Sequence, residues 1–111
     1  MKVTLAHREG RYGVFGIGKK VHFVEAQIDF SPEEMEVVRT KRLNKYVLIT
    51  GGDDNIDYQV KDFAGRTMPV RFADFLAAQA FEIEFRENLH HLKTLIDVGG
   101  RPTNRTDTFE L

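Results

Sequence analysis

The segment from Gly13 to Lys20 reads GVFGIGKK and is close to a phosphate-binding loop. The signature G-x-x-x-x-G-K-[ST] holds phosphate on backbone amides at the start of a helix, and its hydroxyl residue binds Mg²⁺. Here Lys20 replaces the hydroxyl residue, and the next residues, VHFVEAQIDF, alternate as a strand does. The pattern therefore predicts a glycine-rich hairpin bend, at which Lys19 and Lys20 can still hold an anion weakly.

A second candidate site consists of Asp53, Asn55 and Asp57, which have the spacing of the first three ligands in an EF-hand calcium loop. That loop also needs Gly at its sixth position and Glu at its twelfth. This chain has Tyr58 and Ala64 there. We therefore predict a solvated hairpin tip and no metal.

A basic run lies near the end of an expected helix, and its members are Arg39, Lys41, Arg42 and Lys45. Nucleic-acid binding needs such charges on one stripe, with aromatic residues nearby for single strands. At helical spacing the four spread over about 160° and overlap the apolar stripe. Because Glu residues open the same helix, its dipole already explains the run. An anion or nucleic-acid site remains the alternative hypothesis, and its candidate residues are Lys19, Lys20, Arg39, Arg42 and Lys45.

The best local set of metal ligands is Glu87, His90 and His91. Glu87 can meet either histidine at helical spacing, but the two histidines point about 100° apart. This spacing favours an exposed ion pair over a metal site. No spacing in the sequence identifies a catalytic triad or a pair of catalytic carboxylates.

Composition narrows the class of protein. The chain has 111 residues, which is enough for one domain with its own core. Its net charge of −1 creates no general attraction to nucleic acid or to an anionic membrane. Since it has no Cys and no apolar run that could cross a bilayer, thiolate chemistry and a membrane span are excluded. We expect a cytoplasmic protein without a cofactor.

Alternating segments predict strands over residues 2–8, 21–30, 46–50, 56–63 and 67–72, with a turn at Glu9-Gly10. Residues 11–17 are expected to form either a second strand or a loose arm. The apolar parity of residues 21–30 shifts between Phe23 and Val24. The shift indicates either a bulge or a strand that is buried on both faces at that point. Pro69 has no amide hydrogen to donate, which favours an edge position for the last strand.

Two helices are expected. Ser31-Pro32-Glu33-Glu34 contains a capping box and predicts a helix to about Asn44. Its inward candidates are Met35, Val38, Leu43 and Tyr46. A longer helix is predicted over residues 74–98, followed by a disordered tail over 99–111. The order of elements predicts one α+β domain over residues 1–98, in which an antiparallel sheet carries both helices on one face.

The long helix has two apolar faces. The core-facing stripe collects Ala77, Ala78, Phe81, Phe85, Leu89, Leu92, Leu95 and Ile96. Leu76, Ala80 and Ile83 lie nearly opposite, where a helix resting on a sheet would meet solvent. Two explanations stay open: the first helix covers this second set, or another protein chain does. In the second case Glu87 and His90 lie at the rim of the interface.

These patterns lead to three hypotheses. The first is a non-enzymatic protein-interaction module, a homodimer or the partner of another protein. It would associate through Leu76, Ala80, Ile83, Glu87 and His90, through a free sheet edge, or through both. The second is the anion or nucleic-acid site described above. The third is an enzyme whose catalytic residues are gathered by the fold from distant positions.

Overall fold

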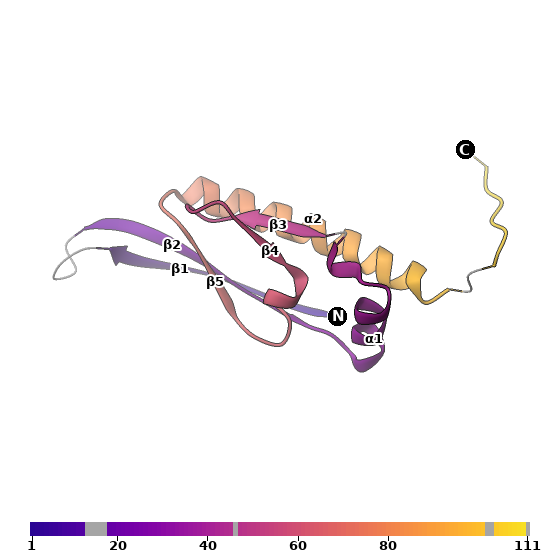
Figure 1. Ribbon diagram of the computed structural model, residues 1–111. Helices are drawn as coiled ribbons and strands as arrows, with labels where there is room; N and C mark the ends of the chain where they lie inside the picture. Colours follow the sequence, from indigo (N-terminus) through magenta and orange to yellow (C-terminus); the bar gives the residue numbers. More distant parts are fainter. Residues whose placement is uncertain (13–17, 46, 102–103, 111) are drawn as a thin grey trace.

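The strands form two antiparallel sheets in a computed structural model that describes residues 1–12, 18–45, 47–101 and 104–110 (Figure 1). The larger sheet has the order β1-β2-β5, and β3 pairs with β4 in a separate hairpin. The strands are β1 (Lys2–Tyr12), β2 (Lys19–Asp29), β3 (Leu48–Gly51), β4 (Ile56–Gln59) and β5 (Met68–Phe72). The helices are α1 (Pro32–Thr40) and α2 (Phe75–Gly99), with 3₁₀ turns η2 (Leu43–Lys45) and η3 (Val60–Asp62). The α+β class with antiparallel sheets is confirmed.

β1 and β2 pair without interruption from Lys2 opposite Asp29 to Tyr12 opposite Lys19. Two predictions were therefore wrong: the turn at Glu9-Gly10, and a bulge at Phe23-Val24. Gly10 lies within β1 opposite Val21, and a Cβ there would meet the ring of Phe23 at 3.4 Å, an ordinary contact.

The parity shift in β2 reflects burial on both faces, the other explanation considered. Val24, Ala26 and Ile28 face the core, while Val21 on the opposite face is only 8% exposed. β5 pairs with β2 alone and so forms one edge, which confirms the position of Pro69. β1 forms the other edge of this sheet.

α1 begins as predicted but ends earlier. Ser31 accepts a hydrogen bond from the Glu34 amide, and the Glu34 carboxylate accepts one from the Ser31 amide. The helix ends at Thr40, and η2 follows after Arg42 has turned into the left-handed region at φ 54°. Val38 and Leu43 are buried, but Met35 is 41% exposed, against its predicted inward position. Tyr46 lies outside the described residues.

The hairpin of β3 and β4 turns at Gly52 and Asn55, which both have positive φ. This confirms the hairpin predicted for the GGDDNID segment. The strand predicted over 56–63 is shorter and gives way to η3. The hairpin tip is tied to β5, since the Asp53 amide donates to the carbonyl of Arg71 at 3.0 Å.

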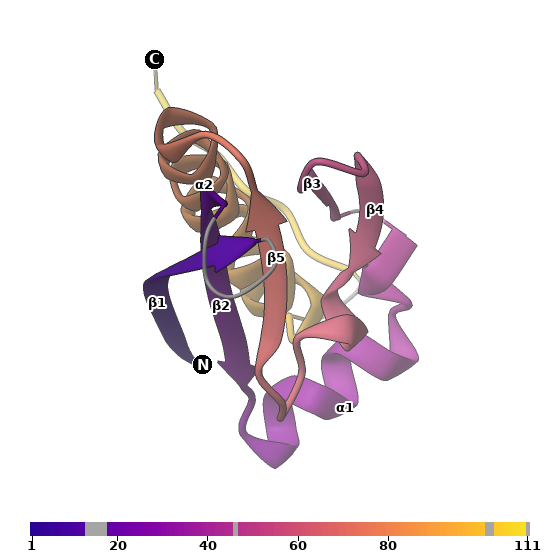
Figure 2. The same cartoon turned by 90° about the vertical axis from the view of Figure 1, so that its left-hand side faces the viewer.

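α2 is the element around which the sheets are arranged (Figure 2). It packs against β2, β5 and β3, while α1 lies near its C-terminal half. Aromatic rings link these parts, with Phe85 between Phe63 at 5.2 Å and Phe81 at 5.8 Å between ring centroids. Six of the eight residues predicted for the core stripe are buried: Ala78, Phe81, Phe85, Leu89, Leu92 and Ile96. Leu95 is half-buried, and Ala77 is exposed because it lies at the edge of the stripe.

Candidate functional site

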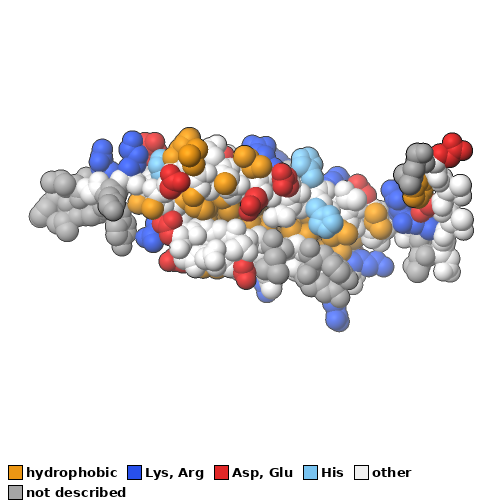
Figure 3. Space-filling model, turned by 90° about the horizontal axis from the view of Figure 1, so that it is seen from above, with side chains coloured by type: hydrophobic (Ala, Val, Ile, Leu, Met, Phe, Trp, Pro, Cys, Tyr) orange, Lys and Arg blue, Asp and Glu red, His pale blue; other side chains and the backbone are white. Residues whose placement is uncertain are grey.

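The outer face of α2, defined here as Leu76, Ala80, Ile83, Glu87 and His90, points away from both sheets. All five residues are exposed. Leu76 is 72% exposed and Ile83 is 59% exposed, which are high values for large apolar side chains. Figure 3 views the molecule from above and shows hydrophobic side chains on the surface over the N-terminal half of α2. No described residue covers this face, so α1 does not bury it.

The outer face follows from the helix repeat. The core residues of α2 recur every three or four positions, and residues offset by half a turn point to the opposite side. Asp74 fixes the start of the helix by accepting a hydrogen bond from the amide of Ala77 at 3.3 Å. The apolar side chains of the outer face therefore sit on a rigid element whose inner side is buried.

Phe75 extends this apolar surface toward β1, a contribution that the sequence analysis missed. Its ring is 49% exposed and lies 5.3 Å from His7 and 5.5 Å from His22 between ring centroids. Helix spacing predicts that Phe75 lies on the helix, but it does not predict contact with two histidines from different strands. That contact could have been predicted only from the register in which β1 pairs with β2.

His7 and His22 form a hydrogen-bonded pair under the ring of Phe75. His7 Nε2 lies 2.9 Å from His22 Nδ1, so one ring donates to the other. His7 Nδ1 also lies 3.1 Å from Gln79 Nε2 and 4.0 Å from a carboxylate oxygen of Glu82. The pair joins the two long strands to α2. Among the described residues no group of three or more His, Cys, Asp or Glu side chains is placed to hold a metal ion.

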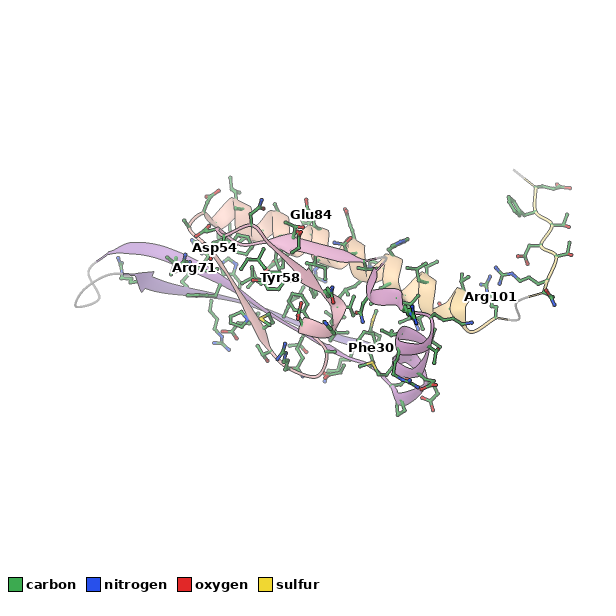
Figure 4. The ribbon with its side chains drawn as sticks, viewed as in Figure 1. Phe30, Asp54, Tyr58, Arg71, Glu84 and Arg101 are labelled. Carbon is green, nitrogen blue, oxygen red and sulfur yellow. The ribbon has the colours of Figure 1, made fainter. Side chains whose placement is uncertain are left out.

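The α1 hollow is a second site, a cavity of about 470 Å³ between α1, η2 and η3. Its lining residues are Phe30, Met35, Val38, Arg39, Arg42, Asn44, Gln59, Val60, Lys61 and Ala64. Figure 4 shows Phe30 between α1 and η3. The hollow brings Arg39 and Arg42 together with Lys61, a residue that the sequence analysis did not assign to any site.

The other candidate anion residues do not join this group. Lys20 lies at the far end of β2 from α1, and a strand of 11 residues spans roughly 30 Å. Lys20 also pairs with Glu9 at 3.6 Å. The side chains of Lys19 and Lys45, and residues 13–17 of the glycine-rich segment, lie outside what the structure describes. Because β2 rather than a helix follows Lys19, the helix required by a phosphate loop is missing.

The cations of the α1 hollow differ in their pairing. Arg39 is held by Glu36 at 2.7 Å. Within the described part of the chain, Arg42 and Lys61 form no ion pair. The carbonyl oxygen of the Asn44 side chain is buried there and has no hydrogen-bond partner among the described residues.

Two ionisable groups elsewhere have displaced pKa values. The Glu34 carboxylate accepts hydrogen bonds from the Met1 ammonium at 3.0 Å and the Ser31 amide at 2.9 Å. The Met1 bond lowers the pKa of Glu34 most, and the Ser31 bond adds to it against the effect of burial, so that the value falls to about 2. Burial raises the pKa of Tyr58, as do the carboxylates of Asp54 and Asp62. Figure 4 labels Tyr58 and Asp54.

Comparison with protein-family models, with curated proteins and with solved structures finds no significant match to this chain. Among the described residues, no helix combines the length and apolar character that a membrane crossing requires. The outer face of α2 and the α1 hollow are therefore the two candidate sites.

Proposed function

We propose that the chain is a protein-interaction module that self-associates through the outer face of α2. The observation that supports this is the exposure of Leu76 at 72% and Ile83 at 59% on a helix whose opposite side is fully packed. Burying such side chains contributes roughly 1.5–3 kcal/mol each. A second copy offers the same apolar surface in return.

The outer face is suited to pairing with itself in an antiparallel manner. Leu76 and Ile83 are separated by two helical turns, and the small side chain of Ala80 lies between them. With a twofold axis beside Ala80, Leu76 of one copy lies against Ile83 of the other, and Ala80 permits close approach. Glu87 and His90 then lie at the rim, where charges contribute specificity more than affinity.

The area of the outer face sets the expected affinity of the dimer. A standard interface buries about 800 Å² on each partner, more than three side chains provide. Phe75, which is 49% exposed beside the same face, enlarges the apolar area. We therefore expect a dimer with a dissociation constant in roughly the micromolar range. The β1 edge is the second surface through which copies can associate.

The test measures oligomeric state by light scattering and sedimentation velocity at several concentrations. We expect the wild-type chain to shift from monomer to dimer as concentration rises. Ile83→Asp should weaken the dimer at least tenfold while circular dichroism stays unchanged, because it places charge in the interface and not in the core. Val98→Asp is the matched control, since Val98 is 40% exposed on α2 but lies near its C-terminal end.

Two outcomes would contradict this proposal. A chain that stays monomeric at all concentrations removes self-association. If Ile83→Asp does not weaken the dimer, the outer face is not its interface. The β1 edge would then be the remaining candidate interface.

A further inference from the structure

We propose that the α1 hollow binds an amphiphilic organic anion, a molecule with a hydrocarbon body and one carboxylate head. This site is separate from the outer face of α2 and does not depend on self-association. Its features come from three parts of the chain: the end of β2 with α1, the η2 turn, and η3.

The body of the hollow is apolar and of suitable size. Its volume of about 470 Å³ falls within the range of small-molecule sites. Val38 and Val60 form buried walls, 4% and 1% exposed, on two different elements. Phe30 and Ala64 complete an apolar lining that a hydrocarbon body would cover.

A smaller hollow of about 250 Å³ adjoins the first and shares Phe30, Met35 and Ala64 with it. These three residues therefore border both spaces, and Met35 among them is 41% exposed. A thioether side chain has three rotatable bonds and adapts to its neighbours. The second space allows the hydrocarbon body to extend past Met35, which favours a chain over a compact ring system.

The charges specify the head group. Arg39, Arg42 and Lys61 line the first hollow, and none of its described lining residues is Asp or Glu. Arg39 is neutralised by Glu36, which leaves Arg42 and Lys61 as two cations without a carboxylate among the described residues. Next to a low-dielectric wall such cations favour an anion over a neutral or cationic head.

Asn44 adds a hydrogen-bond requirement. Its buried side-chain oxygen lacks a partner among the described residues, and an unmade hydrogen bond of this kind costs about 1–3 kcal/mol. A donor on the ligand would satisfy it once the Asn44 side chain turns toward the hollow. We therefore infer that a hydroxyl near the carboxylate strengthens binding, as in a 3-hydroxy acid of medium chain length.

The test is a titration of ¹⁵N-labelled protein, followed by ¹H–¹⁵N spectra, with decanoate, 3-hydroxydecanoate and 1-decanol below their aggregation limits. We expect saturable shifts at the amides of Val38, Asn44 and Ala64. Decanoate should bind about tenfold more tightly than decanol, and 3-hydroxydecanoate several-fold more tightly than decanoate. Ile83→Asp should give the same affinities, which separates this site from the proposed dimer.

Substitutions in the α1 hollow test where the carboxylate head and the hydrocarbon body of the ligand bind. Arg42→Gln with Lys61→Gln should weaken decanoate about tenfold and leave decanol unchanged. Arg11→Gln with Lys20→Gln is the matched control, because it removes two positive charges from the β1–β2 hairpin and should have no effect. Met35→Trp should block the hollow for all three ligands without disturbing the buried core.

Four results would overturn the inference. The first is decanol that binds as tightly as decanoate, and the second is decanoate affinity that stays intact in the variant with Arg42→Gln and Lys61→Gln. Shifts at Leu76 and Ile83 instead of the hollow would show adsorption to the outer face. Binding to phosphatidylglycerol vesicles without any shift from monomeric decanoate would show a membrane-surface property instead of a ligand site.

Discussion

At the residue scale, Glu34 links three parts of the chain: the N-terminal residue that precedes β1, the start of α1, and a lysine on α2. Besides Met1 and Ser31, its carboxylate lies 3.6 Å from Lys93 Nζ on α2. The side chain is buried, with its residue 8% exposed. A single carboxylate therefore links three parts of the chain that are distant in sequence.

This arrangement predicts a pH-dependent contribution to stability. The pKa of Glu34 falls from 4.5 to about 2 on folding, so its contribution is complete above about pH 4.5 and is lost as pH falls through 2. Glu34→Gln should lower the free energy of unfolding by about 1–2 kcal/mol at pH 6. Urea unfolding at pH 6 and pH 2 checks this.

The control is acetylation of the Met1 amine, which removes the same ion pair and leaves the carboxylate. It should reproduce most of the loss at pH 6. If wild type and Glu34→Gln differ in free energy of unfolding by the same amount at both pH values, the assignment is contradicted. Ionisation of the Glu34 carboxylate would then not contribute to stability.

Gly51 gives a second prediction at this scale. A Cβ at this position would overlap the ring of Phe81 on α2, so β3 can lie close to α2 only with Gly there. Gly51→Ala should destabilise the fold by about 1–3 kcal/mol through overpacking. Gly10→Ala is the matched control, because a Cβ there meets only ordinary contacts, the nearest at 3.4 Å. Chemical denaturation should show the smaller loss for Gly10→Ala; equal losses would contradict the packing argument.

At the element scale, the β1–β2 ribbon has two parts with different support. β5 pairs with β2 only between His22 and Ala26, so residues 9–12 of β1 pair with β2 at and beyond the end of β5. Hydrogen exchange should therefore be at least tenfold faster for the paired amides of residues 10–12 than for those of Val24 and Ala26. Equal protection of residues 10–12 and of Val24 and Ala26 would show that the outer part of the ribbon does not open independently.

At the element scale, the sequence was sufficient to predict those features that depend on one short segment of the chain. The capping box at Ser31, the helix of residues 75–99 and the edge position of Pro69 all follow from neighbouring residues. The His7–His22 pair and the α1 hollow do not. Each depends on the register of strands or on the meeting of elements far apart in sequence, which a single sequence does not determine.

The two faces of α2 show the same division. Helical spacing predicted which residues share the second apolar face, because that depends only on the repeat of the helix. Whether α1 would cover the face depended on where α1 packs, and the sequence left both explanations open. Because η2 and α1 lie near the C-terminal half of α2, the apolar face near its N-terminal half is exposed.

At the scale of the whole molecule, the chain is elongated, with extents of 62 × 33 × 20 Å. Residues 104–110 are all exposed, and the one side-chain ion pair that they form with described residues is internal, between Arg105 and Asp107. Truncation after residue 103 should therefore leave the thermal midpoint within about 1 °C of wild type. A larger drop in differential scanning calorimetry would show that the tail packs on the body.

The unbroken pairing of β1 with β2 has a consequence for how this ribbon tolerates insertions. Adding one residue to each strand moves the outer pairs along together, so facing residues stay opposite. One extra residue in a single strand inverts every side chain beyond it unless a bulge absorbs the change. Matched lengthening of both strands is thus accommodated. An unmatched residue close to His22 would turn this side chain out of its buried position and separate it from His7.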